Sequence, residues 1–243
     1  MPVLKTKLTI SLFTFMGLWA FSQNNSQNKI YETYDAIVSS GNTGLYNGTE
    51  FNDPFLNTDG TYRYLNGFDY SKGSVNYNGQ YYSQVSLKYD LLEDNLLTRS
   101  DDNLSIFNVK LISEFVSSFS IYNHNFVRLE NTNLSFAGNG FFEIGYLGEN
   151  LSLYIKRTKK KKDKPMNTGI QYRFSEDNYY VLKTNGVYNV VGKAKDVWKI
   201  LPEMEEQIRE FSKTYKSLSK SNPDSFMIKL VSYLDALDQP SKQ

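Results

Sequence analysis

Residues 73–97 read GSVNYNGQYYSQVSLKYDLLEDNLL, and this stretch decides the fold class of the chain. Asn78-Gly79 separates two runs of alternating apolar and polar residues, which predicts a β-hairpin because both central residues of the turn need a positive φ. In the second run, one face is predicted to carry Tyr81, Ser83, Val85, Leu87 and Tyr89. A turn at Glu93-Asp94-Asn95 extends the hairpin into a β-meander. A sheet with one apolar face must bury it, so further strands or helices should cover this face.

The alternation of strand-length apolar runs and turn residues continues as far as residue 191. Turn signals such as Asn123-His124-Asn125 recur at about the 8–12-residue spacing of short antiparallel strands, and Asn185-Gly186 predicts a second tight hairpin. Residues 45–67 contain Pro54, which a central strand excludes, so irregular connections with short edge pairings are expected there. Residues 45–194 are therefore predicted to form one antiparallel β domain, either a curved sheet or a sandwich.

The hydrophobic period becomes helical after residue 194. Pro202 opens an amphipathic helix predicted over residues 203–216, whose apolar stripe consists of Met204, Ile208, Phe211 and Tyr215. Asn222-Pro223 then supplies an N-cap and a first-turn proline for a last helix. Residues 195–238 are thus expected to pack on the sheet as a helical pair. The predicted fold is mainly β, of the α+β type.

The first residues of the chain predict export. Lys5 and Lys7 precede an apolar stretch at residues 8–21, and Ala20 and Ser22 are the small residues of a cleavage site. The resulting signal peptide ends at Ser22, and the mature protein is expected in the periplasm, at the cell surface or in the medium. An uncleaved anchor is the alternative, disfavoured because the apolar stretch is short for a bilayer.

The mature chain is expected to begin with a polar segment at residues 23–44, a spacer that includes a short helix at residues 30–40. No stretch beyond the signal peptide is long and apolar enough to form a transmembrane helix. We therefore expect a protein that is not transmembrane after cleavage.

The composition removes several kinds of chemistry. The chain has no Cys, which excludes thiol chemistry, thiolate metal sites and the lipid attachment of a bacterial lipoprotein. His124 is the single histidine, so multi-histidine metal sites are excluded and any Ser-His-Asp arrangement depends on this residue. The formal net charge of +1 provides no whole-molecule attraction to nucleic acid, which is not expected as a partner.

The candidate acidic residues are better explained by turns than by chemistry. Glu93-Asp94 and Asp101-Asp102 each lie in an Asn-flanked turn, where Asp is common without any function. Calcium ligation by Asp101, Asp102 and Asn103 lacks the spacing of an EF-hand loop. His124 also lies in a predicted turn. No catalytic, metal-binding or cofactor-binding residue is therefore predicted, and no cofactor is expected.

A lysine-rich run at residues 156–164, KRTKKKKDK, is a candidate for binding anions such as lipopolysaccharide or nucleic acid. The alternative, which we favour, is a solvated loop between strands whose lysines block edge-to-edge association, since no base-stacking aromatics interleave with the run. The candidate anion-binding residues are Lys156, Arg157, Lys159, Lys160, Lys161, Lys162 and Lys164.

Tyrosines cluster around the first hairpin and form a second candidate surface. On an exposed sheet face they would stack on sugars or contact a protein partner. Ordinary packing of half-buried strand positions is the favoured alternative. The candidate residues are Tyr62, Tyr64, Tyr70, Tyr77, Tyr81 and Tyr82.

Several segments resemble those of a group of exported proteins of Bacteroidota. They are LYNGTEF at residues 45–51, the stretch at residues 73–97, ILPEMEEQIREF at residues 200–211 and DSFMIKLVSYLDAL at residues 224–237. The sequence AFSQ at residues 20–23 is similar to flavobacterial signal peptide cleavage regions. The group has no established activity, so the resemblance implies compartment and lineage and assigns no site residue.

These observations predict an exported, non-enzymatic envelope protein that binds or scaffolds a protein, glycan or lipid. One alternative is a lipid or lipoprotein carrier with a cavity under the helices. A carbohydrate-active hydrolase is a second alternative, although the sequence shows no positioned nucleophile, metal ligand set or phosphate loop. The sequence assigns neither the ligand nor the role of the lysine run.

Overall fold

The computed structural model describes residues 44–99, 108–130, 132, 134 and 139–238. All described residues belong to one compact unit, which begins at Gly44. The predicted signal peptide, the spacer with its short helix, and the Asp101-Asp102-Asn103 turn lie outside the described residues.

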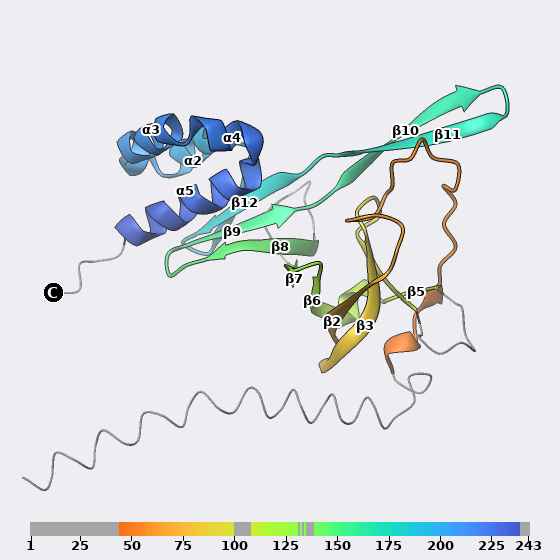
Figure 1. Ribbon diagram of the computed structural model, residues 1–243. Helices are drawn as coiled ribbons and strands as arrows, with labels where there is room; N and C mark the ends of the chain where they lie inside the picture. Colours follow the sequence, from red (N-terminus) through yellow and green to blue (C-terminus); the bar gives the residue numbers. More distant parts are fainter. Residues whose placement is uncertain (1–43, 100–107, 131, 133, 135–138, 239–243) are drawn as a thin grey trace, which may run out of the picture. The chain divides into compact units, whose positions relative to one another are not determined.

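Within the described residues, eleven strands form one antiparallel sheet in the order β1-β5-β4-β3-β2-β6-β7-β8-β9-β12-β13 (Figure 1). Their bounds are β1 (Thr49–Glu50), β2 (Ser71–Tyr77), β3 (Gln80–Asp90), β4 (Asn95–Arg99), β5 (Asn108–Lys110), β6 (Val116–Ile121), β7 (His124–Leu129), β8 (Gly140–Leu147), β9 (Leu151–Lys156), β12 (Tyr179–Thr184) and β13 (Val187–Val191). Two short 3₁₀ turns, η2 (Gly44–Tyr46) and η3 (Ser113–Phe115), precede β1 and β6. The mainly β, antiparallel class predicted from the sequence is confirmed.

The tight turns follow the local sequence with one exception. Asn78 and Gly79 have φ values of 50° and 79°, and Asn185 and Gly186 have 49° and 76°, as the two predicted hairpins require. The turn before β7, however, consists of Tyr122 and Asn123, with φ values of 53° and 64°. The predicted Asn123-His124-Asn125 turn is therefore wrong, and His124 is the first residue of β7.

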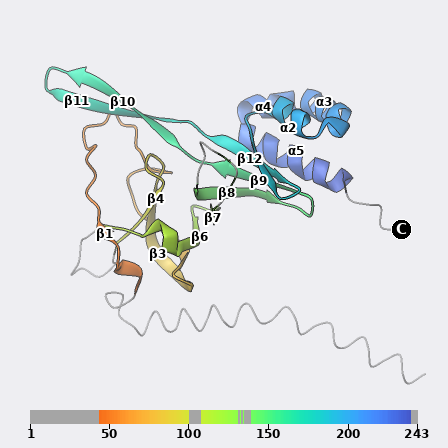
Figure 2. The same cartoon turned by 180° about the vertical axis from the view of Figure 1, so that it is seen from behind.

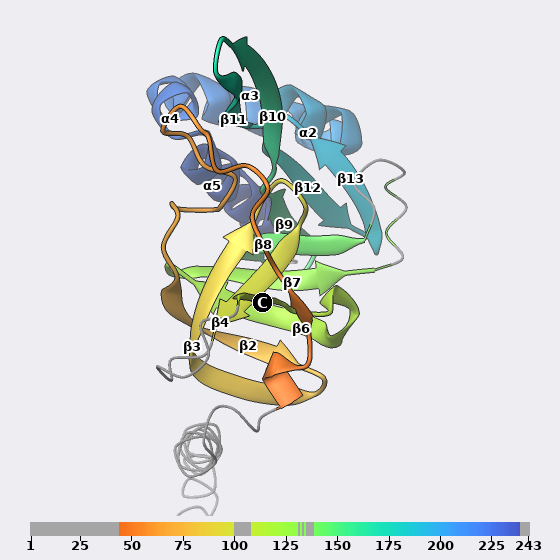
Figure 3. The same ribbon diagram turned by 90° about the vertical axis from the view of Figure 1, so that its right-hand side faces the viewer.

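A β-bulge in β3 changes the face of its first residues. Gln84 has a φ of 54°, and the pairing between β3 and its neighbour β2, which are seen side by side in Figure 3, shifts between Gly73 and Val75. The extra residue reverses the phase of the alternation, because side chains change face at every residue. Tyr82 is therefore buried, whereas the sequence pattern predicted that Tyr81 and Ser83 share the face of Val85.

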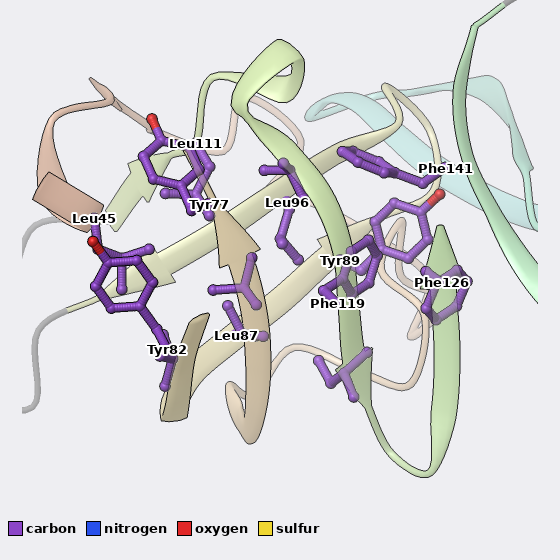
Figure 4. Packing of buried hydrophobic residues seen from close by; sticks show 14 of the residues in the cluster. Leu45, Tyr77, Tyr82, Leu87, Tyr89, Leu96, Leu111, Phe119, Phe126 and Phe141 are labelled. Carbon is purple, nitrogen blue, oxygen red and sulfur yellow. The ribbon is translucent and has the colours of Figure 1, made fainter. Parts of the chain in front are cut away.

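Aromatic rings fill the core formed by the first part of the sheet (Figure 4). Tyr89 meets Phe119 and Phe126 edge to face at centroid distances of 5.1 and 5.0 Å, and Phe119 stacks on Phe126 at 4.6 Å. Phe141 of β8 closes the cluster at 5.2 Å from Phe119. These four rings therefore pack directly against one another in the first part of the sheet.

The C-terminal helices cover one face of β8, β9 and β12 (Figures 1 and 2). They are α2 (Ala194–Ile200), the 3₁₀ turn η4 (Pro202–Met204), α3 (Glu205–Thr214), α4 (Lys216–Ser221) and α5 (Pro223–Leu237). The helical C-terminal region expected on the sheet is confirmed, and it contains more helices than the two amphipathic ones expected. Tyr215, with φ −100° and ψ 25°, ends α3, and the Pro202 turn separates α3 from α2.

The long helix α5 packs on β8 and β9. Its buried residues Leu230, Val231 and Leu234 meet Leu153 and Ile155 in one hydrophobic cluster. Asn222 caps the helix, accepting a hydrogen bond from the Ser225 N–H at 2.9 Å, as the sequence predicts.

The lysine-rich run is strand and not loop. β10 (Lys159–Met166) and β11 (Gly169–Glu176) form a hairpin with its own ladder, inserted between β9 and β12 (Figure 1). Residues 57–59 lie along its β11 edge, where the Tyr172 N–H donates to the Asn57 carbonyl at 2.8 Å. The predicted solvated loop is wrong, because Lys156 ends β9 and the hydrogen-bond ladder of β10–β11 begins at Lys159, which leaves only Arg157 and Thr158 between the strands.

Candidate functional site

A pocket of about 510 Å³ opens between α2, α3, α4 and α5, with Tyr180 of β12 contributing to its lining. Its apolar lining comes from Trp198 of α2, Ile208 of α3, and Phe226 and Met227 of α5. Concave, mainly apolar sites of about 300–1,000 Å³ are the usual binding sites of small molecules. The sequence did not predict this pocket from any motif, because its walls come from four helices and a strand.

Three cationic side chains line the same pocket. Lys193 and Lys195 are exposed and flank the start of α2, and Arg209 lies on α3. Arg209 Nη1 is 3.2 Å from the Glu205 carboxylate one turn earlier on α3. For Lys193 and Lys195, the described part of the chain provides no ion-pair partner. The pocket therefore combines apolar walls with positive charge free to meet a ligand.

Tyr180, which lines the pocket, is also part of a network of ionic and hydrogen-bond contacts. The Tyr180 hydroxyl donates to Asp224 at 2.7 Å, and Arg157 Nη1 donates to the same carboxylate at 2.6 Å. Arg157 Nε donates to Glu143 at 2.5 Å, and His124 Nδ1 lies 2.6 Å from the other Glu143 oxygen. These contacts tie the first turn of α5 to β7, β8, β9 and β12.

The pKa shifts of Glu143 and Tyr180 are consistent with these hydrogen-bonded pairs. Burial raises the pKa of Glu143, but hydrogen bonds from His124 and Arg157 outweigh it and lower the pKa below its usual range. Burial and the bond to Asp224 raise the pKa of Tyr180 well above its ordinary value. Within the described residues, no serine or threonine hydroxyl bonds to His124. These contacts are suited to anchoring α5.

The other end of α5 is held by a buried carboxylate. Asp235 is 1% exposed and accepts hydrogen bonds from the Tyr146 hydroxyl at 3.0 Å and from the backbone N–H groups of Asn150 and Leu151 at 2.9 and 2.7 Å. A Cβ at Gly148 would lie 2.1 Å from an Asp235 oxygen, so the close approach requires glycine there. The sequence signal for this contact is an acidic residue on the apolar face of α5.

A buried ion pair lies outside the helices. Arg63 and Asp90 are 2% and 0% exposed and form two hydrogen bonds, one of them at 2.9 Å from Arg63 Nε. Burial raises the pKa of Asp90, and the Arg63 guanidinium opposes that shift. Asp53 lies 3.5 Å from Arg63 and also accepts from the Tyr64 hydroxyl. The sequence indicated neither partner, because they lie on segments that only the fold brings together.

The candidate tyrosines do not form one exposed row. Three of them, Tyr64, Tyr77 and Tyr82, are buried, and the other three are half-buried. Tyr70 donates its hydroxyl to Asn108 at 2.8 Å, and its ring lies under the Lys88 ammonium at 4.3 Å. Three of the six tyrosines therefore belong to buried positions, and Tyr70 packs against a lysine.

The lysine-rich candidates divide into two sets. Lys156 pairs with Asp94 at 2.6 Å, and Lys159 donates to the backbone carbonyls of Tyr62 and Tyr64. Arg157 belongs to the ionic network described above, and Lys161 lies half-buried over the Phe55 ring. The exposed set consists of Lys160, Lys162 and Lys164 on β10. The seven residues thus do not act as one anion-binding surface.

The described residues contain no cluster of three His, Asp or Glu side chains that would hold a metal ion. Within the same part of the chain, no helix has the length and apolar character needed to cross a membrane. Comparison of the chain with protein-family models, with curated proteins and with solved structures found no match.

Proposed function

We propose that the chain is an exported, non-enzymatic binding protein that holds a small amphipathic anion, such as a fatty acid, in the pocket between α2, α3, α4 and α5. The observation that carries this proposal is one pocket that has apolar walls and unpaired lysines at once. It joins two expectations from the sequence, export and a ligand cavity near the helices.

The apolar part of the ligand is proposed to lie against Trp198, Phe226 and Met227, which line the pocket. Each methylene removed from water contributes about 0.8 kcal/mol, so an alkyl chain of moderate length offsets the cost of association. The anionic group is proposed to lie near Lys193 and Lys195. We expect a micromolar dissociation constant for such a ligand.

Binding is favoured over catalysis by the state of the ionisable groups beside the pocket. Tyr180 and Arg157 are both engaged by Asp224. A catalytic acid or base needs a proton that it can exchange with a substrate, whereas these groups are held in mutual hydrogen bonds. Export is proposed from residues 1–22 and is tested separately, by locating the protein and its N-terminus after cell fractionation.

Trp198 provides a direct assay, because it is the only tryptophan after residue 22. The emission of Trp198 in the mature protein is titrated with octanoate, decanoate, dodecanoate and the matching alcohols. We expect saturable changes in emission. The affinity should rise with the length of the alkyl chain and should be higher for each acid than for the matching alcohol. Absence of a saturable change with every probe overturns the proposal.

A matched pair of variants locates the binding site. Ser212 lines the pocket, whereas Ser217 is exposed on α4 outside it. We expect Ser212→Phe to fill the pocket and to weaken binding at least tenfold, and Ser217→Phe to bind as the wild type does. Equal binding by both variants contradicts the assignment of the site.

A further inference from the structure

The register of the β10–β11 hairpin gathers four cations on one face. Directly paired residues share a face of the ribbon, and the pairs Lys160 with Ser175, Lys162 with Arg173, and Lys164 with Gln171 alternate with pairs on the other side. Lys160, Lys162, Lys164 and Arg173 define this basic face, and all four are exposed. The acidic residues of the two strands, Asp163 and Glu176, belong to the opposite face.

Part of the opposite face is covered by the chain itself. Phe55 meets the rings of Tyr172 and Phe174 at centroid distances of 4.9 and 6.1 Å. The Lys161 ammonium lies 4.8 Å from the centroid of the same Phe55 ring. Phe55 therefore covers the opposite face near Lys161, whereas Asp163, Pro165 and Ile170, further along the same face, are exposed.

The basic face is only partly neutralised within the described structure. Lys160 pairs with Asp177 at 2.7 Å, and Arg173 pairs with Asp59. Lys160 and Arg173 are exposed in both pairs, although Asp59 is half-buried, and pairs of this kind contribute little to stability. Lys162 lies directly opposite Arg173, and like charges in this position are unfavourable. An anionic surface placed against the basic face removes that repulsion.

The end of the hairpin carries exposed apolar side chains on both of its faces. Met166, on the basic face, is 46% exposed, and Ile170, which pairs with Pro165 on the opposite face, is 47% exposed. Leu56, which is 83% exposed, precedes Asn57, whose side-chain amide donates to the Ile170 carbonyl at 2.8 Å. Cations beside exposed apolar residues are typical of elements that bind a membrane interface containing anionic lipids.

We infer that the basic face and the apolar end of the β10–β11 hairpin dock this protein on an anionic lipid surface. Lipid phosphates meet Lys160, Lys162, Lys164 and Arg173, and the apolar end enters the headgroup layer. A nucleic acid partner is less compatible, because Tyr172 and Phe174 lie on the covered face and provide no rings for base stacking.

The test uses the mature full-length chain and sedimentation with vesicles. Vesicles of equal phosphatidylglycerol and phosphatidylcholine are compared with vesicles of phosphatidylcholine alone. We expect partitioning at least tenfold stronger on the anionic vesicles, with the preference falling as salt is raised. Equal partitioning on both vesicle types, or stronger binding to a short single-stranded DNA than to the anionic vesicles, overturns the inference.

Variants with the same change of charge localise the effect. Lys162→Gln/Lys164→Gln is expected to lose at least tenfold in partitioning, and Met166→Ser/Ile170→Ser to lose several-fold. The control Lys213→Gln/Lys220→Gln removes two exposed charges from the helices and is expected to change partitioning less than twofold. A control that loses as much as the hairpin variant contradicts docking through the hairpin. The Trp198 titration is independent of this result.

Discussion

The Asp235 carboxylate on α5 accepts a hydrogen bond from the backbone N–H of Leu151, the first residue of β9, at 2.7 Å. With its bonds to the Asn150 N–H and the Tyr146 hydroxyl, this contact ties the C-terminal half of α5 to the β8–β9 turn. Asp224 holds the first turn of the same helix through Arg157 and Tyr180. The helix that lines the candidate pocket is therefore fixed to the sheet at both ends by carboxylates.

Replacing Asp235 tests the C-terminal anchor. Asp235→Asn presents an amide to buried N–H donors, and we expect the free energy of unfolding to fall by about 2–3 kcal/mol. Urea denaturation followed by circular dichroism measures the change. Asp238→Asn, at an exposed position one turn further along, is the control and should change stability little. Similar losses for both variants contradict a specific role for Asp235.

The same carboxylate predicts how stability depends on pH. Burial raises the pKa of Asp235, but hydrogen bonds from Leu151, Asn150 and Tyr146 outweigh it and lower the pKa below 3.8. A lowered folded-state pKa gives stability that is present above the unfolded value and is lost as pH falls through the folded value. The difference in unfolding free energy between wild type and Asp235→Asn should therefore shrink from pH 5 to about pH 2. A difference that stays constant or grows contradicts this linkage.

The buried pair of Arg63 and Asp90 predicts a second, stronger loss. Arg63→Met leaves the Asp90 charge buried without its partner, and we expect a loss of about 3–5 kcal/mol in chemical denaturation. Arg63→Met/Asp90→Asn should recover part of this loss, because no charge remains unpaired. Arg173→Met removes a pair whose cation is exposed and is expected to change stability little. A double variant no more stable than Arg63→Met contradicts the pairing argument.

The charges of the pocket predict a selective effect on ligand affinity. Lys193→Gln/Lys195→Gln should weaken binding of decanoate several-fold, since the cations that meet the carboxylate are removed. Binding of decanol, which has no charge, should be unchanged. Lys199→Gln, on α2 but outside the pocket, is the control. Equal weakening of acid and alcohol in the Trp198 titration shows that the lysines do not meet the charge.

The bulge in β3 predicts a stabilising substitution. Gln84 has a φ of 54°, where a side chain is strained and glycine is not. We expect Gln84→Gly to raise the free energy of unfolding by up to about 1 kcal/mol. Gln171→Gly, in β11 with no positive φ, should instead lower it by about 0.5–1 kcal/mol. Equal destabilisation by both substitutions contradicts the strained conformation at Gln84.

Ligand-site residues were harder to derive from the sequence than strands and turns. Trp198 and Lys193 had no motif around them, and the pocket exists only because α2, α3, α4 and α5 meet beside Tyr180. In the lysine-rich run, the sequence does not distinguish the exposed lysines from the buried Lys156 and Lys159. The register of β10 and its neighbours separates them.

The sequence by itself determined the antiparallel class, the Asn-Gly hairpins and the Asn222 cap, because each depends on the backbone preferences of a few adjacent residues. The tertiary structure alone decided the Gln84 bulge, the neighbourhood of β2 and β6, and the partners of Asp235 and Arg63. These features join residues that are distant along the chain, or reverse a local alternation to satisfy a neighbouring strand. Their energies come from burial and long-range pairing, which no local pattern records.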